Sequence, residues 1–398
     1  MKAQASTQYV MLTLQSRKCD CIFVESDNEV INKGGTAGYA PVLCGQAFFV
    51  LRQTGKCKRN GRRNHMKKLT SMILSAAVIL SLAGCSASAP ETDTGTEEKK
   101  VYKVAVIKQL DHASLDEIAN AVTGELDALS EEKGIEIVYT VDSGNNDPTV
   151  LQQFGAQYVS GDVDVIIPIA TLAAQTMYTS AEDSGIPVVF AAVSDPESAQ
   201  LTGLENITGT SDGLDTNMIM DMMFAIDPDI KKVGLLYSQS EINSEKPIEL
   251  AKAYLDSKGI AYVEATGNND SEIAQAVTSL IAADVDAVFT PTDNVVMATE
   301  ITTAEKFAEA GIPHYTGADS FVRNGAFATC GVNYTDLGKQ TADLAYQAMT
   351  ETTADMDDYY LVAGGIITVN TETAEALNID YSVFGSMGEV VEVITTED

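Results

Sequence analysis

The 398-residue sequence predicts an α/β fold of two similar, doubly wound parallel-sheet lobes joined by a multi-strand hinge. The first supporting observation is that apolar runs of strand length alternate with helical stretches from residue 101 onward. Runs that are apolar on both faces, with helices between them, are typical of a parallel sheet covered on both sides. The second is an internal repeat, which predicts two lobes of the same design.

The elements of the first lobe follow from this alternation. Each strand is a short run rich in Val and Ile, and each helix is a longer stretch with polar residues between apolar ones. We predict strands at 101–107, 135–141, 163–169 and 186–193, separated by helices at 115–132, 148–160 and 172–184.

Five short stretches of this lobe recur in the same order, 122 to 129 residues further along the chain. Gly144-Asn-Asn-Asp recurs as Gly267-Asn-Asn-Asp, and Gly185-Ile-Pro-Val-Val is matched by Gly311-Ile-Pro-His-Tyr. An ordered series of matches is not expected by chance. It predicts that the strands of each lobe end on one side of a sheet.

The remaining elements are too few for a third lobe, and we expect them to complete the two sheets. The chain would then cross between the lobes more than once, which makes a hinge around a crevice. The predicted division is 101–210 with 334–355 as the N-terminal lobe, 211–333 with 356–381 as the C-terminal lobe, and 382–398 as an acidic tail; the late elements are strands at 326–332 and 360–369 and helices at 336–349 and 371–377.

Residues 66–85 have the layout of a secretory signal. Lys67 and Lys68 form a basic head, an apolar run follows, and small residues lead to Cys85. The apolar run is shorter than the roughly 20 residues that span a bilayer. Its ending, Leu82-Ala-Gly-Cys, resembles the lipobox of bacterial lipoproteins, which implies that Cys85 is acylated. Residues 86–100 are predicted to be a flexible tether.

Residues 1–65 do not have the pattern of a domain. They hold four of the six cysteines, but Cys19 and Cys21 lack zinc-site spacing and His65 is the only histidine near them. Since a signal belongs at the N-terminus, we predict that Met66 is the true start and that 1–65 is a non-native upstream extension. The alternative is a genuine extension removed during export.

The charge of the chain excludes some partners. Up to Cys85 there are 12 basic and 4 acidic residues, so the remaining chain has 25 − 12 = 13 basic and 57 − 4 = 53 acidic residues, a formal charge of −40. Such a surface repels phosphate backbones, so nucleic acid is not expected as a partner. Only Cys85 and Cys330 remain after the signal, so acylation of Cys85 would exclude an internal disulfide.

Polar or small residues gather where the predicted strands end, which is where open parallel sheets bind ligands. The alternative is that they cap helices, because these residue types accept hydrogen bonds from free backbone N–H groups. Both lobes contribute: Gln109, Asp111, His112, Ala170, Thr171, Ser194 and Asp195 from the first, and Ser240, Glu241, Asn243, Ser244, Thr292, Asp293, Asn294, Asp319 and Ser320 from the second.

A hydrolase is the alternative class of function that the sequence offers. Ser211 lies in a G-x-S-x-G stretch, and Asp293 and His314 follow it in the order of a hydrolase triad. The local context is wrong, because a further turn separates Ser211 from the next apolar run. We therefore expect no catalytic residue. No cofactor and no metal are expected either, because nucleotide-binding, calcium-loop and H-x-x-x-H motifs are missing from the sequence.

Several stretches together resemble the ABC-transporter substrate-binding lipoproteins of the tryptophan/tyrosine-type group, which have the type I periplasmic-binding-protein fold. The resemblance covers nearly all of 101–379, and its motifs are specific as an ordered set. They are Gln109-Leu-Asp-His-Ala-Ser-Leu-Asp, Ile169-Ala-Thr-Leu-Ala-Ala-Gln, Val193-Ser-Asp-Pro, Asn206-Ile-Thr-Gly, Ser240-Glu-Ile-Asn-Ser, Pro291-Thr-Asp-Asn, Gly325-Ala-Phe-Ala-Thr and Tyr334-Thr-Asp-Leu-Gly.

The resemblance implies a monomeric protein, lipid-anchored through Cys85 on the extracytoplasmic face of the bacterial membrane. It would capture a small solute, commonly an aromatic amino acid, and deliver it to an ABC transporter permease. A nucleoside or sugar is the alternative solute. The implied ligand-binding residues are Gln109, His112, Thr171, Ser194, Asp195, Glu241, Ser244, Asp293, Asn294 and Asp319.

We assign physical roles to some of these residues. Backbone N–H groups at Thr171 would hold a solute carboxylate, and Asp293 or Asp319 would hold an ammonium. Tyr237 or Phe321 would form an aromatic or small wall.

Overall fold

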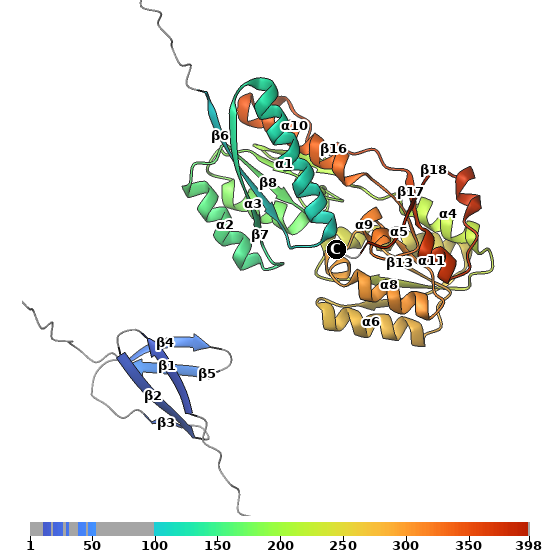
Figure 1. Cartoon of the computed structure of the whole chain (residues 1–398), viewed down its shortest axis with the longest axis horizontal. Helices are drawn as coiled ribbons and strands as arrows, with labels where there is room; N and C mark the ends of the chain where they lie inside the picture. The colour runs from blue at the N-terminus through green and yellow to red at the C-terminus, as the bar shows by residue number, and fades with distance from the viewer. Residues whose placement is uncertain are drawn as a thin grey trace, which may run out of the picture. The chain divides into compact units, whose positions relative to one another are not determined.

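Two parallel sheets organise the chain from residue 99 onward in the computed structural model (Figure 1). Residues 99–396 are described with their side chains. Before them, only the backbone of the strands β1 (Met11–Ser16), β2 (Cys19–Ser26), β3 (Glu29–Ile31), β4 (Tyr39–Cys44) and β5 (Ala47–Arg52) is described, in a separate unit, Met1–Glu91. β1, β2 and β3 pair antiparallel, as do β4 and β5. The predicted signal and Cys85 lie outside the described residues.

The first sheet has six strands in the order β16-β10-β9-β8-β6-β7. All of its pairings are parallel. Its strands are β6 (Val101–Lys108), β7 (Glu136–Ser143), β8 (Val165–Ile169), β9 (Val188–Phe190), β10 (Ile207–Ser211) and β16 (Tyr360–Leu361), and its helices are α1 (Ala113–Lys133), α2 (Pro148–Ser160), α3 (Thr171–Ala181) and α10 (Tyr334–Thr350), with the short η1 (Thr353–Asp355) after α10.

The second sheet has seven strands in the order β12-β11-β13-β14-β15-β17-β18. Only the β15–β17 pairing is antiparallel. Its strands are β11 (Lys232–Tyr237), β12 (Ala261–Thr266), β13 (Ala287–Thr290), β14 (His314–Thr316), β15 (Ala328–Gly331), β17 (Ile366–Asn370) and β18 (Glu389–Val393), and its helices are α4 (Thr216–Ile226), α5 (Ile242–Lys258), α6 (Asp270–Ala282), α7 (Asn294–Met297), α8 (Glu300–Glu309), α9 (Asp319–Arg323), α11 (Thr371–Ala376) and η2 (Ser382–Ser386).

The two sheets share one strand order, which confirms the predicted repeat of α/β lobes. The series β7-β6-β8-β9-β10 in the first sheet corresponds to β12-β11-β13-β14-β15 in the second. The repeated glycines have the same conformation as well. Gly134 ends α1 and Gly259 ends α5, both with positive φ of 65° and 69°, where a side chain would be strained.

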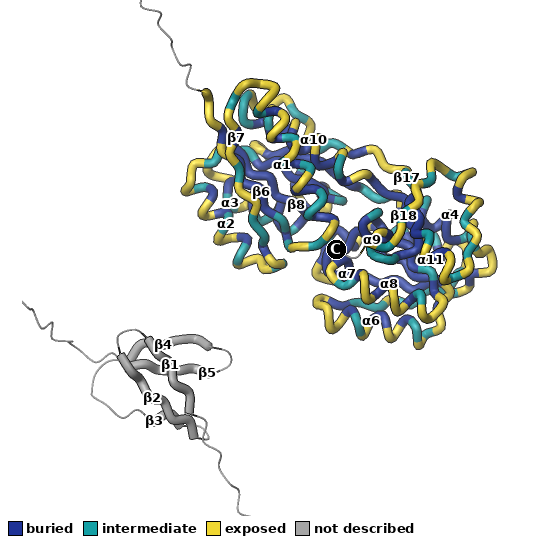
Figure 2. Tube along the Cα trace, in the orientation of Figure 1, coloured by how far each residue is buried: buried dark blue, intermediate teal, exposed yellow. Residues whose placement is uncertain are grey.

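The core of each lobe consists of strand residues and the inner faces of the helices, while the outer helix faces are exposed (Figure 2). Every residue of β8 is buried, as the apolar run predicts. The largest fully buried side chains include Phe190 in the first lobe and Phe289, Tyr315 and Phe327 in the second.

Three segments connect the lobes, one after β10, one between β15 and α10, and one between β16 and β17. The third differs from the prediction of one strand at 360–369. That stretch forms two strands on different sheets, because Gly364 and Gly365 interrupt it and Gly365 adopts φ 97°. β16 pairs with β10, so it belongs to the first lobe and not to the second as predicted.

Residues 382–396 are part of the second lobe rather than a free acidic tail. β18 pairs in parallel with β17, and the Phe384 side chain is fully buried in the core of this lobe. This strand was not predicted from the sequence, because its exposed Glu residues interrupt the apolar run that marks a buried strand. Within residues 99–396, no helix combines the length and apolar character needed to cross a bilayer.

Candidate functional site

A pocket lies between the lobes, where strands of both sheets end. Its free volume is about 20 Å³, which is room for about one water molecule, so the lobes are close together in this conformation. The lining residues come from both lobes and from the connecting segments: His112, Ser114, Leu115, Ala170, Thr171, Ala192, Ser194, Asp212, Asn243, Thr292, Asp293, Asn294, Met297, Phe321 and Tyr334.

Two alanines hold strained backbone at this pocket. Ala170, between β8 and α3, has φ 77°, and Ala192, after β9, has φ 54°. Residues other than glycine, asparagine and aspartate rarely adopt positive φ, and such strain collects at ligand sites. The Ala170 N–H donates to the Ala191 carbonyl at 3.0 Å, which ties these two strand ends together.

Asp212 is a buried carboxylate in the pocket wall that the sequence analysis missed. Its Oδ1 accepts a hydrogen bond from Ser194 Oγ at 2.8 Å, and its Oδ2 accepts one from Tyr334 Oη at 3.0 Å. Burial raises the pKa of Asp212, although both hydroxyl donors favour the ionised form. A carboxylate accepts about four hydrogen bonds, so acceptor capacity remains for a solute.

Asp293 is the N-cap of α7, with both carboxylate oxygens already occupied. Oδ1 accepts from the N–H groups of Val295 and Val296, and Oδ2 accepts from Ser238 N and Ser244 Oγ, both at 2.7 Å. Burial raises the pKa of Asp293, against the effect of these donors. Its four partners fill its acceptor capacity. Asp293 is therefore a helix cap with no acceptor left for a solute, and Ser244 supports it in that role.

A chain of hydrogen bonds joins the lobes beside the pocket. Gln109 Nε2 donates to Glu241 Oε1 at 2.7 Å, and Asn294 Nδ2 donates to Glu241 Oε2 at 2.6 Å. Gln109 belongs to the first lobe, while Glu241 and Asn294 belong to the second. Burial, reinforced by the nearby charge of Asp293, raises the pKa of Glu241 to about 7.

His112 extends this chain into the pocket. It is the N-cap residue of α1, but its side chain makes no capping bond and instead contacts Asn294 Oδ1 through Nε2 at 3.1 Å. Its other ring nitrogen, Nδ1, is buried and has no hydrogen-bond partner. Burial lowers the pKa of His112 to about 4, so the ring is neutral near pH 7. Glu241, the N-cap residue of α5, likewise makes no capping bond.

Two hydroxyl pairs also bridge the lobes. Ser114 Oγ lies 2.5 Å from Ser320 Oγ, at the start of α1 and α9. Ser194 Oγ lies 3.0 Å from Thr292 Oγ1, next to Asp212. Neither pair survives separation of the lobes, so both belong to the closed arrangement.

The ten residues predicted to bind ligand fall into two groups. His112, Thr171, Ser194, Asp293 and Asn294 line the pocket, and of these Asp293 is saturated as a cap. The others lie outside the lining: Gln109 and Glu241 bridge the lobes, Ser244 supports Asp293, Asp195 accepts from Ser198, and Asp319 contacts Arg323 at 3.4 Å.

The two wall candidates also separate. Phe321 lines the pocket, whereas the Tyr237 hydroxyl donates to Glu264 at 2.8 Å, away from the lining. Sequence reasoning missed Asp212 and Tyr334, which lie on segments that connect the lobes, Asp212 directly after β10 and Tyr334 at the start of α10. The sequence signal for Tyr334 was the motif Tyr334-Thr-Asp-Leu-Gly.

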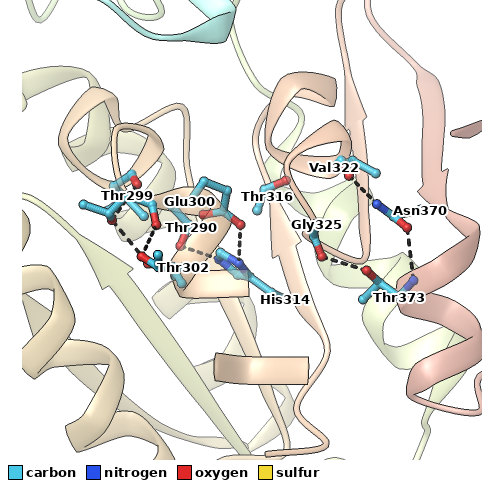
Figure 3. Close-up of polar contacts among 12 residues, drawn as sticks. Thr290, Thr299, Glu300, Thr302, His314, Thr316, Val322, Gly325, Asn370 and Thr373 are labelled. Carbon is cyan, nitrogen blue, oxygen red and sulfur yellow. Dashed lines mark hydrogen bonds and ion pairs between the residues drawn. The ribbon is translucent and has the colours of Figure 1, made fainter. Parts of the chain in front are cut away.

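The proposed hydrolase residues do not meet in the described part of the chain. Ser211 Oγ contacts the Ser194 carbonyl at 3.3 Å, and His314 lies between Glu300 Oε1 at 3.0 Å and Thr290 Oγ1 at 2.8 Å (Figure 3). Glu300, His314 and Thr290 are all buried. This cluster links β13, β14 and α8 inside the second lobe. His314 therefore holds these elements together and does not contact Ser211.

Among residues 99–396, no group of three or more His, Cys, Asp or Glu side chains could hold a metal ion. Cys330 is free and buried in the core of the second lobe.

Residues 103–383 match the family model of ABC transporter substrate binding proteins. The chain is 29% identical over 324 residues to a tyrosine-binding protein of Clostridioides difficile, covering 79% of this chain and 93% of that one. It is also similar to the structure of an ABC domain from Streptococcus pneumonia in complex with L-Trp, with TM-score 0.67 and 28% identity, over 73% of this chain and all of that one. The ligand-free, open structure of a substrate binding protein from Clostridium difficile gives TM-score 0.57 and 27% identity, over 74% of this chain and all of that one.

Proposed function

This chain belongs to the family of ABC transporter substrate binding proteins, and from that premise we propose that it captures an aromatic amino acid in the pocket between its lobes. The observation that carries this proposal is the composition of the pocket. A buried carboxylate with spare acceptor capacity, Asp212, lies in a wall that includes no Lys or Arg. A solute with an ammonium group would satisfy it.

The rest of the pocket supports the other parts of an amino acid. α3 begins at Thr171. Its Leu172 N–H already donates to Gln109 Oε1, and the other N–H groups at this helix start favour a carboxylate. Leu115, Met297 and Phe321 provide an apolar wall for a side chain. The tyrosine-binding and L-Trp-bound relatives favour an aromatic one.

Lobe closure is the mechanism that the contacts support. In this conformation the pocket is too small for an amino acid, so a solute must enter while the lobes are apart, and the lobes would close around it with the pocket wider than it is here. Binding that completes contacts between lobes also explains how a permease would distinguish loaded from empty protein.

We further propose that the protein is a monomer, anchored through an acylated Cys85 on the extracytoplasmic face of the membrane, where it delivers solute to an ABC transporter permease. The signal-like stretch 66–85 supports the anchor. The family supports the permease as partner.

Titration calorimetry on solute-stripped protein tests the ligand. We expect L-tyrosine or L-tryptophan to bind, and a nucleoside or a sugar to give no heat. Tight binding of a nucleoside or sugar, with no response to either amino acid, would replace the proposed solute class. Native mass spectrometry of the protein before stripping identifies any solute that co-purifies.

A further inference from the structure

The hydrogen-bond chain beside the pocket has a fixed direction, which is set at the backbone. Leu172 N, in the first turn of α3, donates to Gln109 Oε1 at 3.1 Å. This bond orients the Gln109 amide, so its Nε2 faces away from Leu172 and donates to Asn146 and to Glu241 Oε1. Glu241 Oε1 is therefore held as an acceptor, and only Oε2 is free to change its role.

Two arrangements satisfy the remaining bonds. If Glu241 is ionised, Asn294 Nδ2 donates to Oε2, and Asn294 Oδ1 accepts the proton on His112 Nε2. His112 Nδ1 is then an unprotonated acceptor. If Oε2 carries a proton, it donates to Asn294 Oδ1 after a half-turn of that amide, and Nδ2 donates to an unprotonated His112 Nε2. The ring proton is then on Nδ1.

We propose that Glu241, acting through Asn294, determines which nitrogen of His112 carries the proton, and thereby whether the pocket offers the solute a hydrogen-bond acceptor or a donor at Nδ1. With Glu241 ionised, His112 Nδ1 accepts a bond from an N–H or O–H group of the solute. The buried Nδ1 without a partner in the pocket wall is the independent sign that this position awaits a ligand group. Glu241 is thus a positioning residue for specificity.

The surroundings favour a proton change at Glu241 rather than at its neighbours. Asp293 lies nearby and accepts four hydrogen bonds, which favour its ionised form against the effect of burial, and an ionised Asp293 makes a second charge beside it unfavourable. The charged groups that act on His112 are Lys108, Asp111 and Asp116, and Lys108 makes ion pairs with both carboxylates. Burial lowers the pKa of His112 most, while the two carboxylates raise it and Lys108 lowers it, so His112 stays neutral while Glu241 changes.

The tautomer is measured directly by ¹⁵N NMR on the full chain labelled at histidine, which contains three histidines. Protonated and unprotonated ring nitrogens have well separated shifts. A Ser114→Cys/Ser320→Cys disulfide holds the lobes together without added solute. Above the pKa of Glu241 we expect protonation of His112 at Nε2, and in Glu241→Gln at Nδ1, because the new amide must donate to Asn294. Lowering the pH should produce the same switch in the parent protein only.

Two controls test whether the effect passes from Glu241 through Asn294 to His112. Glu264→Gln is a matched substitution outside the pocket and should leave the His112 shifts unchanged, because Glu264 contacts Tyr237 and Lys252 instead. In an Asn294→Leu background, Glu241→Gln should no longer change the tautomer, since the connecting amide is gone. The same tautomer in the parent and Glu241→Gln proteins, or a switch that persists without Asn294, would overturn the proposal.

A binding measurement rests on the proposed function and locates the solute donor. L-tyrosine, L-phenylalanine and 3-(4-hydroxyphenyl)propionate differ in whether they carry an ammonium or a ring hydroxyl. Glu241→Gln should weaken L-tyrosine about tenfold or more, but should barely affect the probe that lacks the donor facing His112. Equal weakening of all three probes would contradict a specific contact at Nδ1. If none of them binds the parent protein, the proposed solute is wrong, while the NMR result still decides the relay.

Discussion

The hydroxyl of Tyr334 donates a hydrogen bond to Asp212 Oδ2 at 3.0 Å, although the two residues are 122 positions apart. Asp212 follows β10 and Tyr334 begins α10, so the bond joins two of the three segments that connect the lobes. Both side chains also line the pocket. The carboxylate proposed to hold the solute ammonium therefore lies on the hinge itself, so we expect solute binding there to be coupled to lobe movement.

Asp212→Asn should weaken binding of L-tyrosine or L-tryptophan, because it removes a charged acceptor for the ammonium. Loss of such a bond costs about 1.5–3 kcal/mol, or roughly ten- to hundredfold in affinity. Calorimetric titration measures the change. Asp215→Asn is the matched control, since Asp215 caps α4 outside the pocket and asparagine caps equally well. Equal affinities of the parent and Asp212→Asn proteins would show that the ammonium binds elsewhere.

The stability of the solute-free parent protein, compared with that of Asp212→Asn, should depend on pH. Burial raises the pKa of Asp212 above its usual value, so the folded protein binds this proton more tightly than the unfolded chain. Below the unfolded pKa the group is neutral in both states, and above the folded pKa an ionised group must be buried. Relative to Asp212→Asn, the parent should therefore lose stability as pH rises through the raised pKa, by at most about 1.4 kcal/mol per pH unit. Denaturant unfolding from about pH 4 to about pH 8 tests this, and the opposite slope would contradict it.

Asp293→Ala should destabilise the unliganded protein rather than act on affinity alone. It leaves the N–H groups of Ser238, Val295 and Val296 without their acceptor, which should lower the free energy of unfolding by at least about 2 kcal/mol. Asp293→Asn keeps an oxygen for the two α7 amides, so its free energy of unfolding should lie between those of the parent and Asp293→Ala proteins. Differential scanning calorimetry gives the result. Unchanged stability together with lost affinity would restore Asp293 as a ligand contact.

Ser114→Cys/Ser320→Cys should form a disulfide when the lobes are closed, because the native hydroxyl oxygens lie 2.5 Å apart and an S–S bond is about 2.05 Å. Oxidised protein should then exchange bound solute far more slowly, since the pocket opens only when the lobes separate. A shift in non-reducing electrophoresis reports the bond, and reductant should restore exchange. Ser114→Cys alone is the control. Fast exchange in fully cross-linked protein would place the entry route elsewhere.

Cys85→Ser, expressed with the native signal, should abolish acylation. The protein should then leave the membrane fraction or remain unprocessed, because one serine cannot carry the lipid that holds a soluble domain to a bilayer. Fractionation with mass spectrometry of the N-terminus distinguishes these outcomes. Processed Cys85→Ser protein that stays tightly in the membrane fraction would refute the lipid anchor.

Much of the fold was predictable because it depends on local patterns that repeat. The predicted strands at 101–107 and 163–169 correspond closely to β6 and β8, and the predicted helix 148–160 is α2. The errors are at the hinge and the C-terminus. A two-residue strand such as β16 has no sequence periodicity, and β18 has mostly exposed residues, so neither shows the apolar run on which prediction depends.

The candidate site was only partly predictable. His112, Thr171 and Ser194, which were chosen for their position at strand ends, line the pocket, and their contact with a solute stays a prediction. It could not separate caps from free side chains, because the same residue types do both. Asp293 and Glu241 are each N-cap residues, yet Asp293 caps its helix and Glu241 reaches across to Gln109.

The sequence by itself determined the class of this protein, through the alternation of apolar runs, the internal repeat and the ordered motifs, since these reflect burial and backbone geometry within each lobe. Only the tertiary structure decided which polar groups face the pocket with capacity to spare. Hydrogen-bond capacity is finite, and its use depends on partners such as Ser194 and Tyr334 for Asp212, which come from distant parts of the chain. The contacts between the lobes exist only when the two lobes meet, so no local pattern encodes them.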